Sequence, residues 1–146
     1  MFTPGNIVYF TPFYFKNAAA SKNKYFIILK DIDAQVILGS LPTSKIFLPN
    51  RIQEEHGCIE VPDGCINCYL FVKGRLIGQN GFSFPVLTAI YGQQIDLYDK
   101  SVIESQYPLE NVHYKIIDTL LPEELEAVLN CLRTSSSVKR KYKHLL

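Results

Sequence analysis

The chain has 146 residues, of which 47% are hydrophobic and 12% aromatic, and its formal net charge is +1. This length and composition predict one folded domain with a substantial core and exclude a largely disordered chain. No apolar run approaches the ~20 residues of a membrane-spanning helix, so we expect no membrane partner. The first residues carry no basic segment before Pro4-Gly5, which predicts no signal peptide and a cytoplasmic protein with reduced thiols.

The small net charge hides an uneven distribution. Residues 1–30 carry four lysines and no acid, and residues 139–146 carry four cations and no acid, whereas residues 31–138 have a net charge of −7. Two interpretations of the basic C-terminus stay open: it is a solvated, frayed end, or it joins the N-terminal lysines in one cationic surface. The acidic middle can serve as a docking face for a basic partner.

Runs of β-branched and aromatic residues predict many short strands. They lie at residues 7–11, 25–29, 36–38, 58–61, 65–72, 76–78, 88–91, 94–98 and 114–117. Pro12 is expected to end the first strand. The aromatic residues 13–15 follow in a predicted loop, where they either cap one end of a barrel or stack on the bases of a ligand.

Two helices are predicted, one at residues 99–106 and one at residues 122–133. In the second, Leu125, Val128, Leu129 and Leu132 form a single apolar stripe, and Pro122 suits the first turn. Short strands followed by an amphipathic helix predict a mainly β fold, a small antiparallel barrel with a C-terminal helix packed against it. We assign residues 1–134 to this domain and residues 135–146 to a basic tail.

The segment from Lys22 to Lys45 predicts a hairpin that is buried on both sides, because its two apolar runs show no strict alternation. The start of one strand and the end of the next lie at the same end of an antiparallel hairpin. Cations and hydroxyl groups should therefore meet at one rim and suit a phosphate group. These side chains are Lys22, Lys24, Thr43, Ser44 and Lys45.

The order of these parts resembles the MazF/PemK/Kid family of toxin endoribonucleases. Residues 4–10 (PGNIVYF) are similar to the family's opening strand, residues 24–29 (KYFIIL) to its second strand, and residues 41–44 (LPTS) to a strand end with Thr-Ser. Residues 94–100 (QIDLYDK) are similar to its Gln-Ile-Arg-Thr-Val-Asp-Lys segment. The resemblance covers roughly residues 4–134, with a divergent middle, and implies an SH3-like barrel and a homodimer.

The resemblance also implies metal-independent cleavage of single-stranded RNA by an Arg–Thr pair. Carried over, the pair falls on Lys24 and Thr43, with Lys in place of the family's Arg, and Asp96 stands at a second family Arg. Lys24 can supply charge to the phosphorane, although an ammonium does not grip two oxygens in a fork. His56 is the nearest candidate base by residue type, and a surface His is the alternative.

Further RNA contacts are assigned to residues of the same basic and hydroxyl-rich segments. Lys22, Lys45 and Lys16 are candidate cations, and Ser44 is a candidate hydrogen-bond donor to phosphate. We expect no cofactor. Cys58, Cys65 and Cys68 with His56 offer a possible zinc site, but buried free cysteines, including Cys131, are the preferred interpretation because residues three apart in a strand face opposite ways.

Two function hypotheses therefore stand side by side. The first is an RNA-cleaving toxin of a toxin–antitoxin system, neutralised by an antitoxin peptide or protein. The second is a non-catalytic barrel module that binds a protein or RNA, as in the gyrase-poisoning CcdB toxins, which have a related fold. A homodimer is expected under both.

Overall fold

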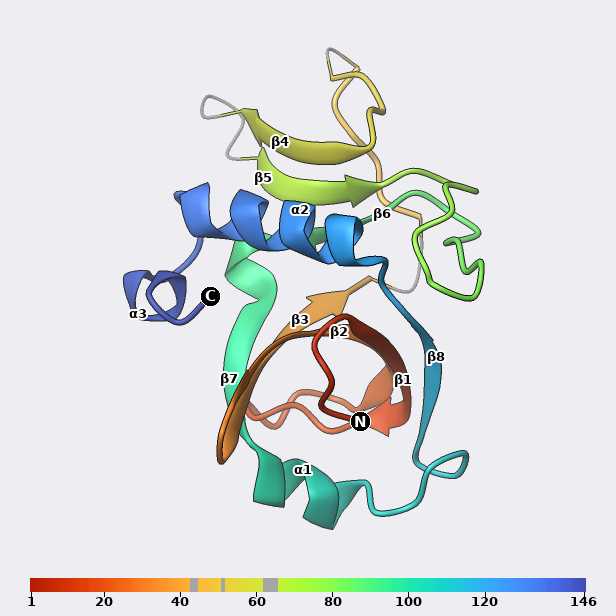
Figure 1. Cartoon of the computed structure of the whole chain (residues 1–146), viewed down its shortest axis with the longest axis vertical. Helices are drawn as coiled ribbons and strands as arrows, with labels where there is room; N and C mark the ends of the chain where they lie inside the picture. Colours follow the sequence, from red (N-terminus) through yellow and green to blue (C-terminus); the bar gives the residue numbers. More distant parts are fainter. Residues whose placement is uncertain (43–44, 51, 62–65) are drawn as a thin grey trace.

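A computed structural model describes residues 1–42, 45–50, 52–61 and 66–146 of the chain. The described part is mainly β and contains two antiparallel sheets (Figure 1). None of its helices has the length and apolar character needed to cross a bilayer.

The larger sheet has five strands in the order β7-β3-β2-β1-β8. Their bounds are Asn6–Phe13 (β1), Lys22–Ile32 (β2), Gln35–Leu41 (β3), Ile95–Asp99 (β7) and Tyr114–Thr119 (β8). The smaller sheet has the order β4-β5-β6, with β4 at Gly57–Val61, β5 at Ile66–Phe71 and β6 at Thr88–Tyr91. The described strands pair into these two separate sheets and do not close into the single barrel that we expected.

The described residues also form helices and a 3-10 turn. Helix α1 spans Lys100–Gln106, α2 spans Pro122–Thr134, α3 spans Arg140–Lys143, and the 3-10 turn η2 spans Gly92–Gln94. The two predicted helices are confirmed as α1 and α2. Helix α2 lies between the two sheets in Figure 1 and packs on β4 and β5.

The predicted hairpin is confirmed as β2 and β3. Their register pairs Tyr25 with Leu41, so the start of β2 and the end of β3 do lie at one rim. Neighbouring residues of β2 enter different clusters: Ile27 packs between the sheets, whereas Ile28 packs toward α1. This burial on both faces explains why the sequence shows a continuous apolar run instead of alternation.

The prediction that Pro12 ends the first strand is wrong. Strand β1 continues to Phe13, and its register with β2 shifts between Phe10 and Phe13. Proline lacks the N–H that a regular ladder needs, and a bulge is one of the places where a strand tolerates it. Phe13 is consequently a core residue with 1% exposure, while Tyr14 is 52% exposed.

The strand predicted at residues 76–78 is also wrong, because only Gly78 makes an isolated bridge, to Leu120. The buried carboxylate of Asp118 accepts hydrogen bonds from the backbone N–H groups of Asn80 and Phe82 and so holds this stretch in a turn. A Cβ on Gly78 would lie 2.1 Å from Asp118 Oδ2, so the close approach requires glycine.

The cysteines differ from the expectation of free thiols. Cys58 in β4 and Cys131 in α2 form a disulfide, although 73 residues separate them in the sequence. The bond removes Cys58 from any zinc site. Cys68 is free and buried, as predicted, and burial raises the pKa of its thiol to about 11. Cys65 lies outside the described residues.

Candidate functional site

Several hollows lie next to one another along the β7 edge of the larger sheet, and we call them together the edge groove. It consists of three adjoining hollows of about 490, 280 and 160 Å³. Phe15 and Tyr98 line both the first and the second, and Ser40 and Gln94 line both the second and the third. Because they share these walls, the hollows follow one another from the side of α1 to the rim of the β2–β3 hairpin.

Lys24 stands at the hairpin end of the edge groove. It lines the third hollow with Ser40, Pro42, Tyr91 and Gln94, among other residues. Burial, followed by the positive charge of the nearby Lys22, lowers the pKa of the Lys24 ammonium. A lowered pKa makes the ammonium a better proton donor, which suits a general acid.

The polar wall beside Lys24 is arranged by β3 and η2. Ser40 is 8% exposed, and its hydroxyl donates to Gln94 Oε1 at 3.0 Å. Burial, with a smaller contribution from Cys68, raises the pKa of the Tyr91 phenol, so this phenol keeps its proton at neutral pH. Among the described residues that line this hollow there is no carboxylate and no imidazole. The site therefore offers donors and a cation, with no obvious base.

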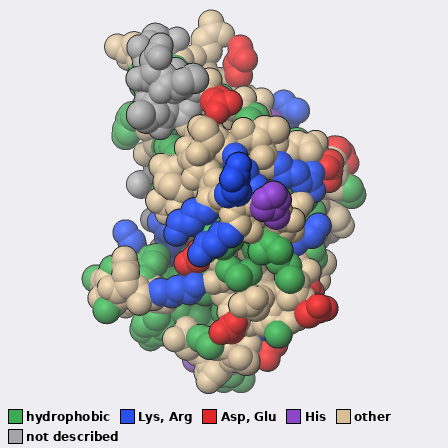
Figure 2. All heavy atoms as spheres, turned by 90° about the vertical axis from the view of Figure 1, so that its left-hand side faces the viewer, with side chains coloured by type: hydrophobic (Ala, Val, Ile, Leu, Met, Phe, Trp, Pro, Cys, Tyr) green, Lys and Arg blue, Asp and Glu red, His purple; other side chains and the backbone are tan. Residues whose placement is uncertain are grey.

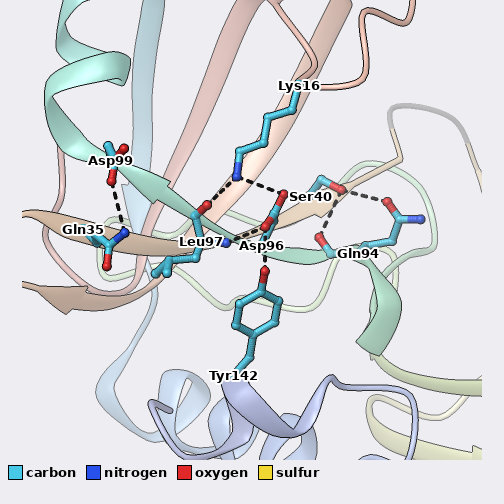
Figure 3. A network of polar contacts seen from close by, with 8 residues as sticks. All are labelled: Lys16, Gln35, Ser40, Gln94, Asp96, Leu97, Asp99 and Tyr142. Carbon is cyan, nitrogen blue, oxygen red and sulfur yellow. Dashed lines mark hydrogen bonds and ion pairs between the residues drawn. The ribbon is translucent and has the colours of Figure 1, made fainter.

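Asp96 in β7 is the centre of a second part of the groove. Its carboxylate accepts a hydrogen bond from Tyr142 of α3 at 2.8 Å and pairs with Lys16 Nζ at 3.2 Å. Figure 3 shows Lys16 and Tyr142 approaching Asp96 from opposite sides. Burial raises the pKa of Asp96, but the hydrogen bonds from Tyr142, the Leu97 amide and Lys16 outweigh burial and bring the pKa below its ordinary value. Asp96 is thus ionised and already neutralised by its neighbours.

The predicted site residues are only partly brought together. Lys22 and Lys24 lie near each other at the rim, as expected. Lys16 lines the edge groove but is engaged by Asp96 and by the ring of Tyr98, 4.1 Å from its ammonium. Lys45 is exposed and lies 5.6 Å from the ring of Phe47. Thr43 and Ser44 lie outside the described residues.

His56 does not belong to the edge groove. Its Nδ1 accepts from the backbone N–H of Val72, and its Nε2 lies 2.5 Å from Glu124 Oε1, which also accepts from the Tyr69 hydroxyl at 2.9 Å. The His56 side chain is only 9% exposed. It is therefore neither a base beside Lys24 nor the surface histidine of the alternative. It belongs to a closed polar cluster between β5 and α2.

Some contributors to the groove were not predicted from the sequence. Gln94 and Tyr91 lay inside segments predicted only as strands, and Ser40 lay just after the strand predicted at residues 36–38. Tyr142 lay in the basic tail, although Val138, Tyr142 and Leu146 recur at every fourth position, a spacing that is typical of a buried helical face. That spacing was the available signal for a packed C-terminus.

Cations gather on the face that contains the groove. Figure 2 shows several Lys and Arg side chains there, beside a His and next to an area of apolar side chains. Lys139, from the C-terminal segment, lines the second hollow, and Lys16, from the N-terminal segment, lines the first. The two basic ends of the chain thus meet along one groove, in agreement with the second interpretation of the basic C-terminus.

The described residues contain no group of three or more His, Cys, Asp or Glu side chains arranged to hold a metal ion. No protein-family model, no curated protein and no solved structure matches the chain.

Proposed function

We propose that this protein is a MazF/PemK-like toxin that binds single-stranded RNA along the edge groove and cleaves it beside Lys24 without a metal ion. One observation carries the proposal: Lys24, whose pKa is lowered, lies in a hollow with hydrogen-bonding side chains, and the other hollows of the edge groove lead away from it. The position of Lys24 at the rim corresponds to the family's catalytic Arg by resemblance.

The chemistry of the hollow fits the needs of phosphodiester cleavage by the 2′-hydroxyl. Charge builds up on the phosphorane oxygens, and the Lys24 ammonium can stabilise it and donate a proton to the leaving 5′-oxygen. The Gln94 amide can donate to a phosphate oxygen. Thr43 is the remaining member of the proposed pair, and it follows Pro42, which lines the hollow.

The rest of the groove suits an unpaired strand more than a duplex. The aromatic residues Phe15 and Tyr98 line it, with Lys16 over the Tyr98 ring, and bases of any identity can stack on aromatic rings. Side-chain amides of Gln93 and Gln94 supply donors and acceptors at base edges. The 2′-hydroxyl requirement of the reaction then gives selectivity for RNA over DNA.

A second candidate function is a non-catalytic module that binds RNA or a protein on the same groove. The absence of a carboxylate or imidazole among the described residues lining the Lys24 hollow favours it, because 2′-hydroxyl attack is helped by a base. Lys24 in place of the family's Arg also favours the non-catalytic module, because an ammonium does not grip two phosphate oxygens in a fork. Binding without cleavage would be the observable difference.

Several further properties belong to the same proposal by resemblance. They are an SH3-like arrangement of the strands, a homodimer, an antitoxin peptide or protein as partner, and a cytoplasmic location. The Cys58–Cys131 disulfide argues against the last of these, because cytosolic thiols are held reduced.

The test is incubation of the purified protein with a long single-stranded RNA in EDTA, with Lys24→Ala and Lys115→Ala beside it. Lys115 is an exposed cation on β8, at the opposite edge of the larger sheet, and controls for loss of charge. We expect discrete fragments ending in cyclic phosphate from the wild type and from Lys115→Ala, and intact RNA from Lys24→Ala. Intact RNA from every folded protein, with RNA still bound, would favour the non-catalytic module. Equal cleavage by all three would contradict a site at Lys24.

A further inference from the structure

The segment after α2 is packed against the domain and is not a frayed end. Val138, Tyr142 and Leu146 are 4%, 4% and 7% exposed and belong to the main core cluster. The Tyr142 hydroxyl donates to Asp96, and Arg133 Nε donates to the backbone oxygen of Leu146 at 2.8 Å. Apolar and polar contacts therefore fix this segment beside the edge groove.

A glycine in the groove wall allows this packing. A Cβ placed on Gly92 would lie 2.7 Å from Ser135 Oγ and 2.9 Å from Ser137 Cβ. The link between α2 and α3 thus passes directly over η2, where any side chain would push it away. Gly92 directly follows Tyr91, which lines the hollow beside Lys24. The close packing at Gly92 therefore fixes the segment that leads to α3 next to this hollow.

The other side of the same segment carries only positive charge. Lys139, Arg140 and Lys141 are exposed, Lys143 is half-buried, and residues 135–146 contain no acid. Lys139 and Lys141 lie 5.9 and 5.1 Å from the Tyr142 ring, whose hydroxyl is fixed by Asp96. Lys139 also lines the edge groove, so the row of cations begins inside the groove and continues onto α3.

We infer that α3 is a phosphate-binding clamp for the stretch of single-stranded RNA that continues beyond the edge groove; this rests on the proposed function of the groove. Lysine is depleted at protein–protein interfaces, whose centres are apolar, whereas lysine and arginine are the residues that neutralise the phosphates of nucleic acids. Apart from Leu145 at 37%, the segment exposes no large apolar side chain to a protein partner. An RNA backbone therefore fits this surface better than an acidic protein.

The experiment compares two triple variants that each remove two lysines and one arginine. The first is Arg140→Gln, Lys141→Gln and Lys143→Gln in the clamp. The second is Lys73→Gln, Arg75→Gln and Lys115→Gln, from the loop after β5 and from β8, which lie on the other side of the molecule from α3 (Figure 1). Binding is measured by fluorescence anisotropy over a range of salt concentrations, with 2′-fluoro RNA that lacks the attacking hydroxyl.

Two probe lengths separate the clamp from the groove, about 4 and about 16 nucleotides, which span the usual site sizes for single strands. For the long probe we expect the clamp variant to bind about tenfold more weakly, and its slope of log K against log salt to fall by about 0.7 for each lost phosphate contact. The short probe and the control variant should match the wild type within twofold.

The outcomes separate the inference from the proposed function. A clamp variant that matches the wild type on the long probe, or a control variant that loses as much, overturns the clamp while groove binding stands. A wild type that binds neither probe overturns both. Displacement of the long probe by poly-glutamate at equal charge, as effective as unlabelled RNA, would overturn the clamp in favour of an acidic protein partner. If the clamp variant has a lower melting temperature than the wild type, the single exposed change Arg140→Gln replaces it in the comparison. It must then lower the slope of log K against log salt for the long probe by about 0.7.

Discussion

Glu124 and Asp96 each organise a polar network in which a tyrosine and a basic side chain meet one carboxylate, but the two networks have different surroundings. The side chains of Glu124 and His56 are 11% and 9% exposed, and the cluster joins β5 to α2 inside the fold. The side chains of Asp96 and Lys16 are 40% and 53% exposed and line the edge groove. Similar chemistry therefore stabilises the fold in one place and faces solvent in the other.

Breaking the buried network around Glu124, which we call the closed network, should have the largest effect on stability. Glu124→Leu leaves the His56 and Tyr69 donors unpaired in the interior, and we expect the free energy of unfolding to fall by about 4 kcal/mol. Glu123→Leu is the control, because Glu123 is exposed in the same first turn of α2 and loses the same interaction with the helix dipole. Urea unfolding of both variants checks this, and equal losses would contradict the role assigned to the cluster.

The disulfide supports the same interface and should have the next largest effect. Replacing Cys58 and Cys131 by Ser removes the cross-link between β4 and α2, which should lower the free energy of unfolding by about 3 kcal/mol. Dithiothreitol should lower the melting temperature of the wild type and leave that of the double variant unchanged. No response of the wild type to the reductant would show that the bond does not form.

We call the solvent-facing network around Asp96 the open network. A side chain on Gly92 should disturb it, because it displaces the segment that carries Tyr142, without unfolding the domain. Gly92→Ala presses on Ser135 and Ser137 and should cost about 2 kcal/mol as the C-terminal segment shifts. Amide hydrogen exchange should then rise in residues 135–146 and stay unchanged in α2. Uniformly faster exchange would mean that the segment is not locally packed.

The open network should contribute least, and its contribution should depend on pH. Because the pKa of Asp96 in the folded protein lies below the ordinary 3.8, the folded state binds fewer protons, so the stabilisation is present above pH 3.8 and disappears as the pH falls through the lower pKa. Asp96→Asn should cost less than about 1 kcal/mol at pH 7, since both partners are largely exposed. The exposed Asp33→Asn is the control, and a loss that does not shrink as the pH falls below 3.8 would contradict this assignment.

The part of the fold that follows from local sequence was predictable. The β2–β3 hairpin, α1 and α2 were visible in apolar runs, turn residues and helix periodicity. The continuation of β1 through Pro12 was not, because it depends on a bulge against β2. The Cys58–Cys131 bond joins residues 73 apart, which no spacing rule connects.

The candidate site was predictable only at its rim. Lys22 and Lys24 follow from the hairpin geometry, whereas Gln94 and Tyr91 approach Lys24 through the tertiary fold. His56 could not be placed from the sequence, because its partner Glu124 is 68 residues away. Asp96 was noticed as a departure from the family pattern, but its role depends on Tyr142 and Lys16, which come from opposite ends of the chain.

RNA binding along the edge groove is tested most directly by photo-cross-linking with single-stranded RNA that contains 4-thiouridine, followed by mass spectrometry of the linked peptides. If RNA lies along the edge groove, cross-links should form to the groove aromatics Phe15, Tyr91 and Tyr98 and should be lost when unlabelled RNA is added in excess. Cross-links that instead fall on the loop around Lys73 and Arg75, with the groove aromatics unmodified, would contradict it.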